Sequence, residues 1–321
     1  MDKMWDKYGD IRNELSAVIA LMEKNTKCKD KKIESSIKEL IYSGGKMLRP
    51  AFVLISSHFG DYDPVKARSL AAVIEMLHMA TLVHDDVIDD AKLRRGQETI
   101  QSKYGKDYAV YIGDFLLCVC FQILASSSTL QSIKIDSKSM SRVCLGEINQ
   151  LNSRFDTNLS VKNYLNRVSG KTAELFSLSL YTGAAEAGCS NGLSRKFWRI
   201  GHNIGMAFQI IDDILDYVGS DTSVKKPVGN DIKQGIFTLP FIYAAKKDKA
   251  SFEEYLRKES FSDEDIQNII DLVNKNRGID NAKELADKYT TKAFKLINSL
   301  PENPYKAVLK EVAEKLLLRT Y

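Results

Sequence analysis

Apolar residues recur at helical spacing along most of the chain. The first predicted helix has one apolar stripe, built at alternating steps of four and three residues from Met4, Tyr8, Ile11, Leu15, Val18 and Met22. The same periodicity predicts further helices over residues 33–42, 50–59, 64–90, 104–128, 138–153, 161–187, 194–218, 238–246, 251–257, 263–275, 278–299 and 304–319. We find no convincing period-two strand pattern. Because the chain has no Gly/Ser-rich or Pro-rich linker, the pattern predicts a single all-α domain over residues 1–321.

One acidic spacing occurs twice inside these helical segments. Asp85-Asp86-Val87-Ile88-Asp89 and Asp212-Asp213-Ile214-Leu215-Asp216 both have the form DDxxD, and apolar residues surround both. Positions one turn apart share a helix face at about 5–6 Å, so each motif presents a pair of carboxylates. At an effective dielectric near 20, unit charges about 6 Å apart oppose each other by roughly 3 kcal/mol, which a divalent cation would turn into attraction. The motifs therefore predict two magnesium sites with oxygen ligands, rather than two solvated acidic turns.

Basic residues accompany the first acidic motif. Lys46 and Arg49 precede it on a loop that follows a pair of glycines, and Arg94-Arg95-Gly96 follows it. Arginine binds phosphate oxygens with two parallel hydrogen bonds, and magnesium bridges carboxylate to diphosphate. This alternation of acids and bases indicates a site that holds metal and phosphate together.

Polar residues share the helix faces of the two motifs. At 100° per residue, His78 lies on the face of Asp85 and Asp89, and Gln209 lies on the face of Asp212 and Asp216. A lone histidine on an apolar helix is also typical of a satisfied core residue. The Gly170-Lys171-Thr172 sequence resembles the end of a nucleotide phosphate loop, but the G-x-x-x-x-G-K-[ST] pattern lacks its first glycine.

Composition excludes several classes of protein. The formal net charge is +4, from 46 basic and 42 acidic residues, so the chain lacks the basic field that nucleic-acid binding requires. Its five cysteines are scattered in a long chain and are expected to be reduced thiols. The N-terminus is too charged for a signal peptide, and no run approaches 18 apolar residues. We expect a cytoplasmic enzyme without a transmembrane segment.

The ordered motifs resemble those of the trans-prenyltransferases, the polyprenyl diphosphate synthase family, from about residue 40 to about residue 245. The family's GGKxxRP is present at 44–50, and its long first aspartate motif at 76–96. The resemblance continues through Gly146-Glu147 with Gln150, Lys171-Thr172-Ala173, Phe208-Gln209 before the second motif, Lys226-Pro227 and Thr238-Leu239-Pro240.

This resemblance implies the isoprenoid synthase fold, a single large helical bundle around a deep central cavity that holds three magnesium ions. It implies that isopentenyl diphosphate elongates an allylic diphosphate such as farnesyl diphosphate, in a reaction that begins with ionisation. Direct metal ligands would be Asp85, Asp89 and Asp212, whereas Asp86, Asp213 and Asp216 would act through water or hydrogen bonds. Isopentenyl diphosphate would be held by Lys46, Arg49, His78 and Arg95. The allylic substrate would contact Arg94, Lys171, Thr172, Gln209 and Lys226.

Product length in the family depends on side chains below the first motif. Ala80 and Thr81 occupy these positions and are small, so we expect a cavity that admits a tail longer than fifteen carbons. The sequence looks most like the catalytic large subunit of two-component hexaprenyl or heptaprenyl diphosphate synthases, which serve quinone side chains and work with a smaller regulatory subunit. Such a product, of about 30–35 carbons, would partition into membranes. A homodimeric synthase of another chain length is the alternative.

Two features leave other readings open. Family members often carry lysine after the glycine of the GKxTLP segment, whereas Ile236 follows Gly235 here, which puts one allylic phosphate contact in doubt. The loop around Lys225–Asp231 could close over a site or could simply be solvated.

Two other classes of protein are alternatives to a prenyl diphosphate synthase. A terpene cyclase would usually lack the second DDxxD motif, and a non-catalytic regulatory subunit would generally lose its aspartates.

Overall fold

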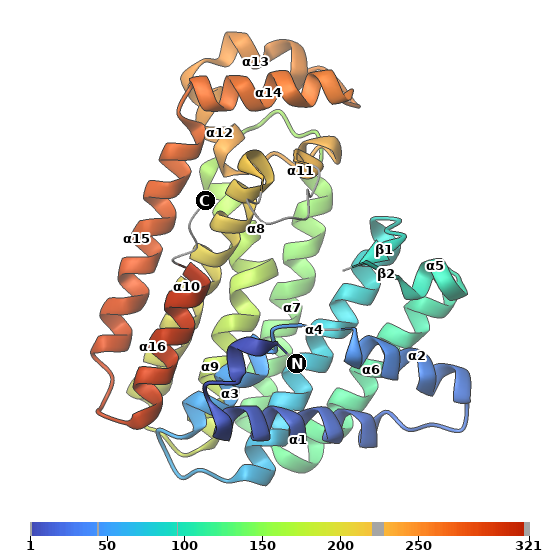
Figure 1. The fold of residues 1–321 in the computed structure, drawn as a ribbon, viewed down its shortest axis with the longest axis vertical. Coiled ribbons are helices and arrows are strands. Elements are labelled where there is room, and N and C mark those ends of the chain that lie inside the picture. The colour runs from blue at the N-terminus through green and yellow to red at the C-terminus, as the bar shows by residue number, and fades with distance from the viewer. Residues whose placement is uncertain (1, 44, 95, 220–227, 318–321) are drawn as a thin grey trace. The chain divides into compact units, whose positions relative to one another are not determined.

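The computed structural model describes residues 2–43, 45–94, 96–219 and 228–317, and it is almost entirely helical (Figure 1). This confirms the all-α prediction. A 3-10 turn η1 (Lys3–Trp5) precedes the helices α1 (Gly9–Asn25), α2 (Lys31–Tyr42), α3 (Leu48–Ser57), α4 (Pro64–Ile88), α5 (Ile100–Tyr104), α6 (Lys106–Ser127), α7 (Leu130–Asn152), α8 (Val161–Val168), α9 (Glu174–Glu186), α10 (Asn191–Val218), α11 (Asn230–Lys233), α12 (Leu239–Lys247), α13 (Lys249–Leu256), α14 (Asp263–Lys275), α15 (Gly278–Asn298) and α16 (Pro304–Leu317). A π-helical turn η2 (Ser169–Ala173) joins α8 to α9, and β1 (Leu93–Arg94) pairs antiparallel with β2 (Gln97–Glu98).

The chain forms two compact units, each assembled from separate stretches of sequence. Unit 1 comprises Met1–Ser137, Leu178–Phe197 and Pro301–Val308. Unit 2 comprises Lys138–Ser177, Trp198–Leu300 and Leu309–Tyr321. Helices α7, α9, α10 and α16 each contribute residues to both units. The single domain expected from the sequence stays a prediction.

Unit 1 is organised around α4. The helix begins at Pro64, because the Asp63 side chain accepts the N–H of Val65 at 2.9 Å and of Lys66 at 3.2 Å, and proline suits a first helical turn. Its buried residues lie on several sides, and α1, α3 and α6 pack around it (Figure 1). A helix that is surrounded in this way must be apolar over most of its circumference.

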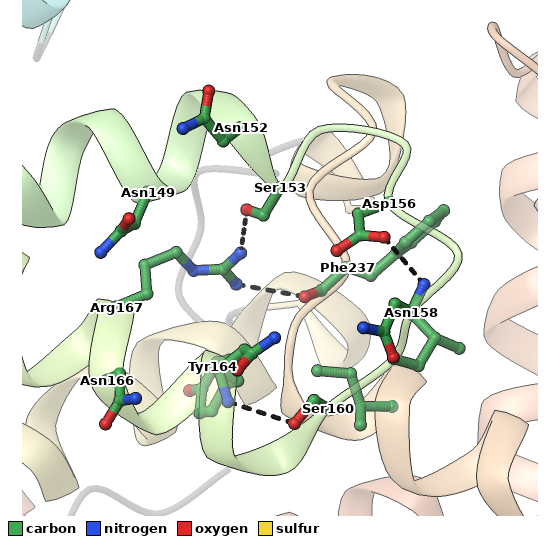
Figure 2. A pocket seen from close by; sticks show the side chains of 13 residues that line it. Asn149, Asn152, Ser153, Asp156, Asn158, Ser160, Tyr164, Asn166, Arg167 and Phe237 are labelled. Carbon is green, nitrogen blue, oxygen red and sulfur yellow. Dashed lines mark hydrogen bonds between the residues drawn. The ribbon is translucent and has the colours of Figure 1, made fainter.

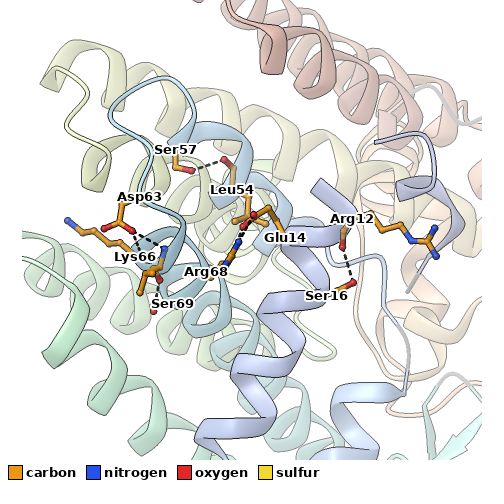
Figure 3. Close-up of polar contacts among 10 residues, drawn as sticks. Arg12, Glu14, Ser16, Leu54, Ser57, Asp63, Lys66, Arg68 and Ser69 are labelled. Atoms are coloured by element: carbon orange, nitrogen blue, oxygen red, sulfur yellow. Dashed lines mark hydrogen bonds and ion pairs between the residues drawn. The ribbon is translucent and has the colours of Figure 1, made fainter. Parts of the chain in front are cut away.

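A partly buried ion pair connects α1 to α4. Arg68 donates from Nε and from Nη2 to the two carboxylate oxygens of Glu14, each at 2.7 Å (Figure 3). This fork geometry holds the planar guanidinium and the carboxylate in one arrangement. The hydrogen bonds from Arg68 hold the pKa of Glu14 below its ordinary value, although burial opposes that effect. The pair fixes the register of α1 against the central helix.

Unit 2 is organised around α12, which contacts α8, α13, α14 and α15 (Figure 1). Phe237 stacks on Phe241 with ring centroids 4.2 Å apart, at the start of this helix. A capping box begins α14, where the Ser262 side chain accepts the N–H of Asp265 and the Asp265 side chain accepts the N–H of Ser262.

Several boundaries differ from the sequence prediction. The first regular helix begins at Gly9, and Met4 belongs to η1. Helix α7 begins at Leu130 rather than near residue 138, because the Thr129 hydroxyl accepts the N–H of Ser132 at 3.2 Å and caps the additional turns. The hairpin of β1 and β2 and the short helices α5 and α11 were not predicted.

Helix α6 is the most apolar long helix that the structure describes. It has 22 residues with a mean hydropathy of 1.9 in its best window, which is enough to cross a membrane by length and composition alone. The sequence reading found no apolar run of that length. However, 44% of that window is buried in the structure, as in a helix that packs within a core. Its other side exposes Tyr111 and Phe121, which are 74% and 57% accessible to solvent.

Candidate active site

The first acidic motif occupies the last turn of α4 in unit 1. Asp85 is half-buried, and the backbone N–H of Asp89 donates to the Asp85 carbonyl at 2.8 Å, which closes the helix. Asp86 is buried and accepts from Arg94 Nε at 2.8 Å, while Arg94 Nη2 lies 2.7 Å from the same oxygen. A guanidinium therefore already neutralises Asp86. The carboxylates of Asp85 and Asp89 stand one turn apart at a partly exposed helix end.

The hairpin after α4 brings Arg94 back to Asp86. Ala91 donates its N–H to the Asp86 carbonyl at 3.0 Å. The Ala91 carbonyl in turn accepts from Thr99 Oγ1 at 2.7 Å and from Gln101 Nε2 at 2.6 Å. These three hydrogen bonds fold the chain back tightly behind the motif. Arg94 was predicted to contact the allylic substrate, and here its guanidinium is held by the motif itself.

The residues predicted to hold isopentenyl diphosphate belong to the same unit as the first motif. Lys46 is exposed, and its carbonyl accepts the indole N–H of the fully buried Trp5 at 2.7 Å. Met47 follows with a left-handed φ of 50° and starts α3, which places Arg49 half-buried in the first turn. His78 is half-buried on α4, about two turns before Asp85 and about three turns before Asp89. Sequence reasoning missed Trp5, which anchors the Lys46 loop.

The second acidic motif lies on α10 in unit 2, and its three aspartates have different surroundings. Asp212 is exposed, whereas Asp213 is buried. The Asp216 carboxylate accepts the backbone N–H of Asn230 at 3.1 Å and of Asp231 at 3.0 Å. Asp216 thereby caps α11 and ties the chain after the motif back to the motif.

A chain of hydrogen bonds sets the orientation of Asp213. Thr172 Oγ1 donates to Gln209 Oε1 at 2.7 Å, and Gln209 Nε2 donates to Asp213 Oδ1 at 2.7 Å. The other oxygen, Oδ2, accepts from the Tyr164 hydroxyl at 2.6 Å. Burial raises the pKa of Asp213, and these donors oppose that rise. Both oxygens of Asp213 therefore have hydrogen-bond partners within unit 2.

Close contact between α7 and η2 positions Lys171. The ammonium of Lys171 donates to Glu147 Oε2 at 2.6 Å. A Cβ added to Gly146 would lie 2.6 Å from the backbone nitrogen of Lys171, so only glycine allows this approach. Gly170 has slightly more room, because a Cβ there would lie 3.0 Å from the Arg142 carbonyl oxygen and 3.2 Å from the Gly146 Cα. The two glycines let α7 meet the π-helical turn that carries Lys171 and Thr172.

Three further residues of unit 2 belong to the site and escaped sequence reasoning, namely Tyr164, Arg167 and Asp231. Burial, followed by repulsion from Asp213, Asp216 and Asp212, raises the pKa of Asp231. The nearby Arg167 guanidinium opposes this rise. Asp231 is the last residue of the loop predicted around Lys225–Asp231, two positions after Gly229, and it lies in α11. Gly44, Arg95, Lys225, Lys226 and Pro227 lie outside the described residues.

The position where relatives often carry lysine is apolar and enclosed. Ile236 is buried and forms an isolated antiparallel bridge with Arg154. Gly235 before it has a left-handed φ of 72°, and its carbonyl accepts the N–H of Phe155 at 2.8 Å. The side chain at position 236 therefore contributes packing rather than charge.

A polar cavity of about 360 Å³ opens on unit 2 next to Tyr164 (Figure 2). Its lining includes five asparagines, Asn149, Asn152, Asn158, Asn163 and Asn166. The guanidinium of Arg167 crosses it and donates to Ser153 Oγ at 2.6 Å and to the Phe237 carbonyl at 3.1 Å. No residue of the sequence-predicted site lines this cavity.

The donor set of the motifs suits magnesium. The resemblance assigns the metal to Asp85, Asp89 and Asp212, and carboxylate oxygens are the hard ligands that this ion prefers. Among the described residues, no three His, Cys, Asp or Glu side chains gather into a metal-binding group of their own. Mg²⁺ usually takes one or two carboxylates and completes its shell with water and substrate phosphates. The residues present therefore fit such an ion.

Ala80 and Thr81, the residues predicted to set product length, lie on α4 before the first motif. Ala80 is fully buried, and the half-buried Thr81 donates its hydroxyl to the His78 carbonyl at 2.8 Å. Leu77 and Ile74 continue the buried side of the helix. The side chains of Ala80 and Thr81 are smaller than those of Leu77 and Met79, which precede them on the helix.

Comparison with known proteins places this arrangement among prenyl synthases. The sequence model of the polyprenyl synthetase family matches residues 30–273. Heptaprenyl diphosphate synthase component 2 of Bacillus subtilis is 34% identical over 98% of this chain and 90% of its own length. The structure of geranylgeranyl pyrophosphate synthase from Lactobacillus brevis superposes with a TM-score of 0.93 at 36% identity, covering 99% of both chains. A polyprenyl synthase from Caulobacter crescentus, solved with calcium and isoprenyl diphosphate, superposes with a TM-score of 0.89 at 30% identity, covering 96% of this chain and 95% of that one.

Proposed function

This chain belongs to the polyprenyl synthetase family, and we propose that it makes a long all-trans prenyl diphosphate in a magnesium-dependent reaction. The fold is that of the prenyl synthases, and the enzyme is a prenyltransferase that elongates a prenyl diphosphate. We propose farnesyl diphosphate or a similar allylic diphosphate as primer, and isopentenyl diphosphate as the unit added. The polyprenyl synthase crystallised with calcium and isoprenyl diphosphate supports the use of a divalent metal.

The different surroundings of the aspartates carry the metal proposal. Asp86 pairs with Arg94, and Asp213 and Asp216 accept hydrogen bonds from protein donors. Asp212 is exposed, and Asp85 and Asp89 are half-buried at the end of α4. Asp85, Asp89 and Asp212 would hold up to three ions. When bound, magnesium would neutralise the charge that develops on the departing diphosphate.

The residues proposed to bind the two diphosphates come from both units. Lys46, Arg49 and His78 of unit 1, with Arg95, would hold isopentenyl diphosphate. Lys171, Thr172 and Gln209 of unit 2, with Arg94 and Lys226, would orient the allylic diphosphate. Loss of diphosphate leaves an allylic carbocation, the isopentenyl double bond attacks it, and a proton then leaves to give the new trans double bond. These residues act by holding both diphosphates while that attack occurs.

Small side chains on α4 support a product of about 30–35 carbons. Ala80 and Thr81 offer little steric obstruction to a growing tail, which would follow α4 past Leu77 and Ile74. The relatives include a geranylgeranyl synthase and a heptaprenyl synthase component, so family membership leaves the length open. We propose that the product serves as a quinone side chain.

An exposed apolar face on α6 supports a partner subunit. Tyr111, Cys118 and Phe121 are exposed at steps of seven and three residues, which places them along one side of the helix. Large exposed apolar side chains in a row are typical of protein interfaces. We propose that this face binds either a smaller regulatory subunit, as the name component 2 suggests, or a second copy of the chain. Purification alone and with candidate small subunits, followed by chromatographic sizing of the product, distinguishes these partners.

Elongation with labelled isopentenyl diphosphate, farnesyl diphosphate and magnesium tests the proposed function. Asp85→Asn and Asp212→Asn should each lower turnover by about 100-fold or more while the circular dichroism spectrum stays unchanged. Asp90→Asn is the matched control, because Asp90 follows the motif but is salt-bridged to Lys92 and Lys106. Asparagine also tolerates its left-handed φ of 49°. Turnover that survives in both motif variants would refute the assigned metal ligands.

A further inference from the structure

Tyr164 of α8 lies directly behind the second acidic motif. Its side chain is 2% exposed, and its hydroxyl donates to Asp213 Oδ2 at 2.6 Å across 49 positions of sequence. Asp213 lies next to Asp212, the exposed carboxylate to which we assign a metal. The hydroxyl therefore touches the immediate neighbour of a proposed ligand, and it contacts neither substrate in our assignment.

Arg167 holds the tyrosine ring in place. The residue is 7% exposed, and its guanidinium donates to two neutral acceptors, the Ser153 hydroxyl and the Phe237 carbonyl (Figure 2). The guanidinium carbon lies 5.5 Å from the centroid of the Tyr164 ring, within the range of a cation–π interaction. The loop before α8 and the segment before α12 hold the arginine in place, so turning the Tyr164 ring away would lose its contact with the guanidinium.

The opposite oxygen of Asp213 is held just as firmly. Gln209 donates to Oδ1, and Thr172 fixes the amide orientation of Gln209 through its own hydroxyl. The Asp213 carboxylate is thus held by a hydrogen bond from Tyr164 of α8 on one side. On the other side it is held by Gln209 of α10, which Thr172 of η2 orients. A rotation of α10 that moved Asp213 would have to break hydrogen bonds on both sides. Such a rotation would also change the direction in which Asp212 points, because both residues belong to α10.

We propose that Tyr164 and Arg167 are positioning residues that lock Asp213 and thereby aim Asp212 at the metal and the allylic diphosphate. This inference rests on the proposed function. Donors that orient a metal ligand from behind typically change metal affinity or activity by about 10-fold to 100-fold when they are removed. The pair acts within unit 2 and should leave the isopentenyl site of unit 1 unaffected.

Tyr164→Phe removes the hydroxyl and keeps the ring over Arg167. We expect about a 10-fold rise in the Mg²⁺ concentration for half-maximal turnover and about a 10-fold fall in kcat. We expect KM for isopentenyl diphosphate to change less than twofold. Mn²⁺ binding in the presence of inorganic diphosphate, followed by electron paramagnetic resonance, should weaken by the same factor without any turnover being measured. Arg167→Met should produce a smaller loss in the same direction, because it frees the ring but keeps the hydroxyl.

Two comparisons separate positioning from a general loss of structure. Tyr289→Phe removes a half-buried hydroxyl on α15 of the same unit and should behave as wild type. In an Asp213→Asn background, Tyr164→Phe should add little, because the pair acts through that carboxylate. Mn²⁺ affinity equal to wild type in folded Tyr164→Phe would overturn the proposal. If Tyr164→Phe fails to fold, unchanged Mn²⁺ affinity in Arg167→Met overturns it instead. A wild-type protein that binds Mn²⁺ but elongates nothing would count against the proposed function only.

Discussion

Asp136 is a buried acid outside the candidate active site, and its replacement by asparagine should stabilise the protein at alkaline pH. The residue lies on α7 within unit 1 and is 4% exposed. Burial, followed by repulsion from Glu186, raises the pKa of Asp136 from 3.8 to about 7, and the nearby Thr182 hydroxyl offsets part of that shift. The Glu186 carboxylate is itself paired with Lys66 of α4, so that cation is already engaged.

The sign and size of the effect follow from linkage between protonation and folding. The folded state binds the Asp136 proton more tightly than the unfolded state, so this acid's favourable contribution is complete below about pH 4. It is lost as the pH rises toward about 7. At about 1.4 kcal/mol per pKa unit, the stability lost relative to low pH is about 2 kcal/mol at pH 5, where only the unfolded chain ionises, and about 4 kcal/mol at pH 8. Asparagine has nearly the same shape and does not ionise, so Asp136→Asn escapes this cost.

Urea denaturation of wild type and Asp136→Asn at pH 5 and pH 8 measures the difference. The variant should gain about 2 kcal/mol more in unfolding free energy at pH 8 than at pH 5. Asp114→Asn on α6, where the carboxylate is exposed, is the matched control and should show no such change. A stability difference between Asp136→Asn and wild type that is the same at both pH values would refute the reasoning.

Three further predictions concern packing and chain length. Gly146→Ala should destabilise the protein by about 1–3 kcal/mol and raise KM for the allylic substrate, because its Cβ would meet the Lys171 backbone; thermal unfolding and kinetics check this, and Gly192→Ala, which faces open space, should change neither. Ala80→Phe should shorten the product, as measured by chromatography of the dephosphorylated prenols. A product of unchanged length would show that position 80 does not limit the growth of the tail. Arg68→Met should cost about 1 kcal/mol in low salt and less in high salt, and a cost independent of salt would argue against the ion pair with Glu14.

The helices were predictable because their signals are local. Apolar periodicity located the central helix α4, and Asp63-Pro64 marked its start within one residue. The start of α7 was missed because a single threonine cap outweighs the mixed composition of residues 130–137. The π-helical turn was missed because the sequence 161–187 keeps a helical pattern on both sides of it. The apolar spacing of residues 161–187 does not indicate that one turn contains an additional residue.

The sequence predicted those candidate site residues whose chemical type alone indicates a role, such as carboxylates for metal and basic groups for diphosphate. The aspartates and the basic residues were recognised from their motifs, but the partners of Asp86, Asp213 and Asp216 depend on folding. Tyr164 resembles a core residue in the sequence, and its role appears only when α8 lies against α10. The capping of α11 by Asp216 likewise joins a side chain to backbone groups that carry no sequence signal.

The π-helical turn at Ser169–Ala173 has a consequence for how this chain can vary. One residue more than a regular turn needs rotates everything after it by about 100° relative to the segment before it. Deleting a single residue here would restore a continuous α-helix and swing the downstream side chains off their present neighbours. Insertions and deletions should therefore be far less tolerated at this turn than in the surface loops, although it lies within what reads as one long helix.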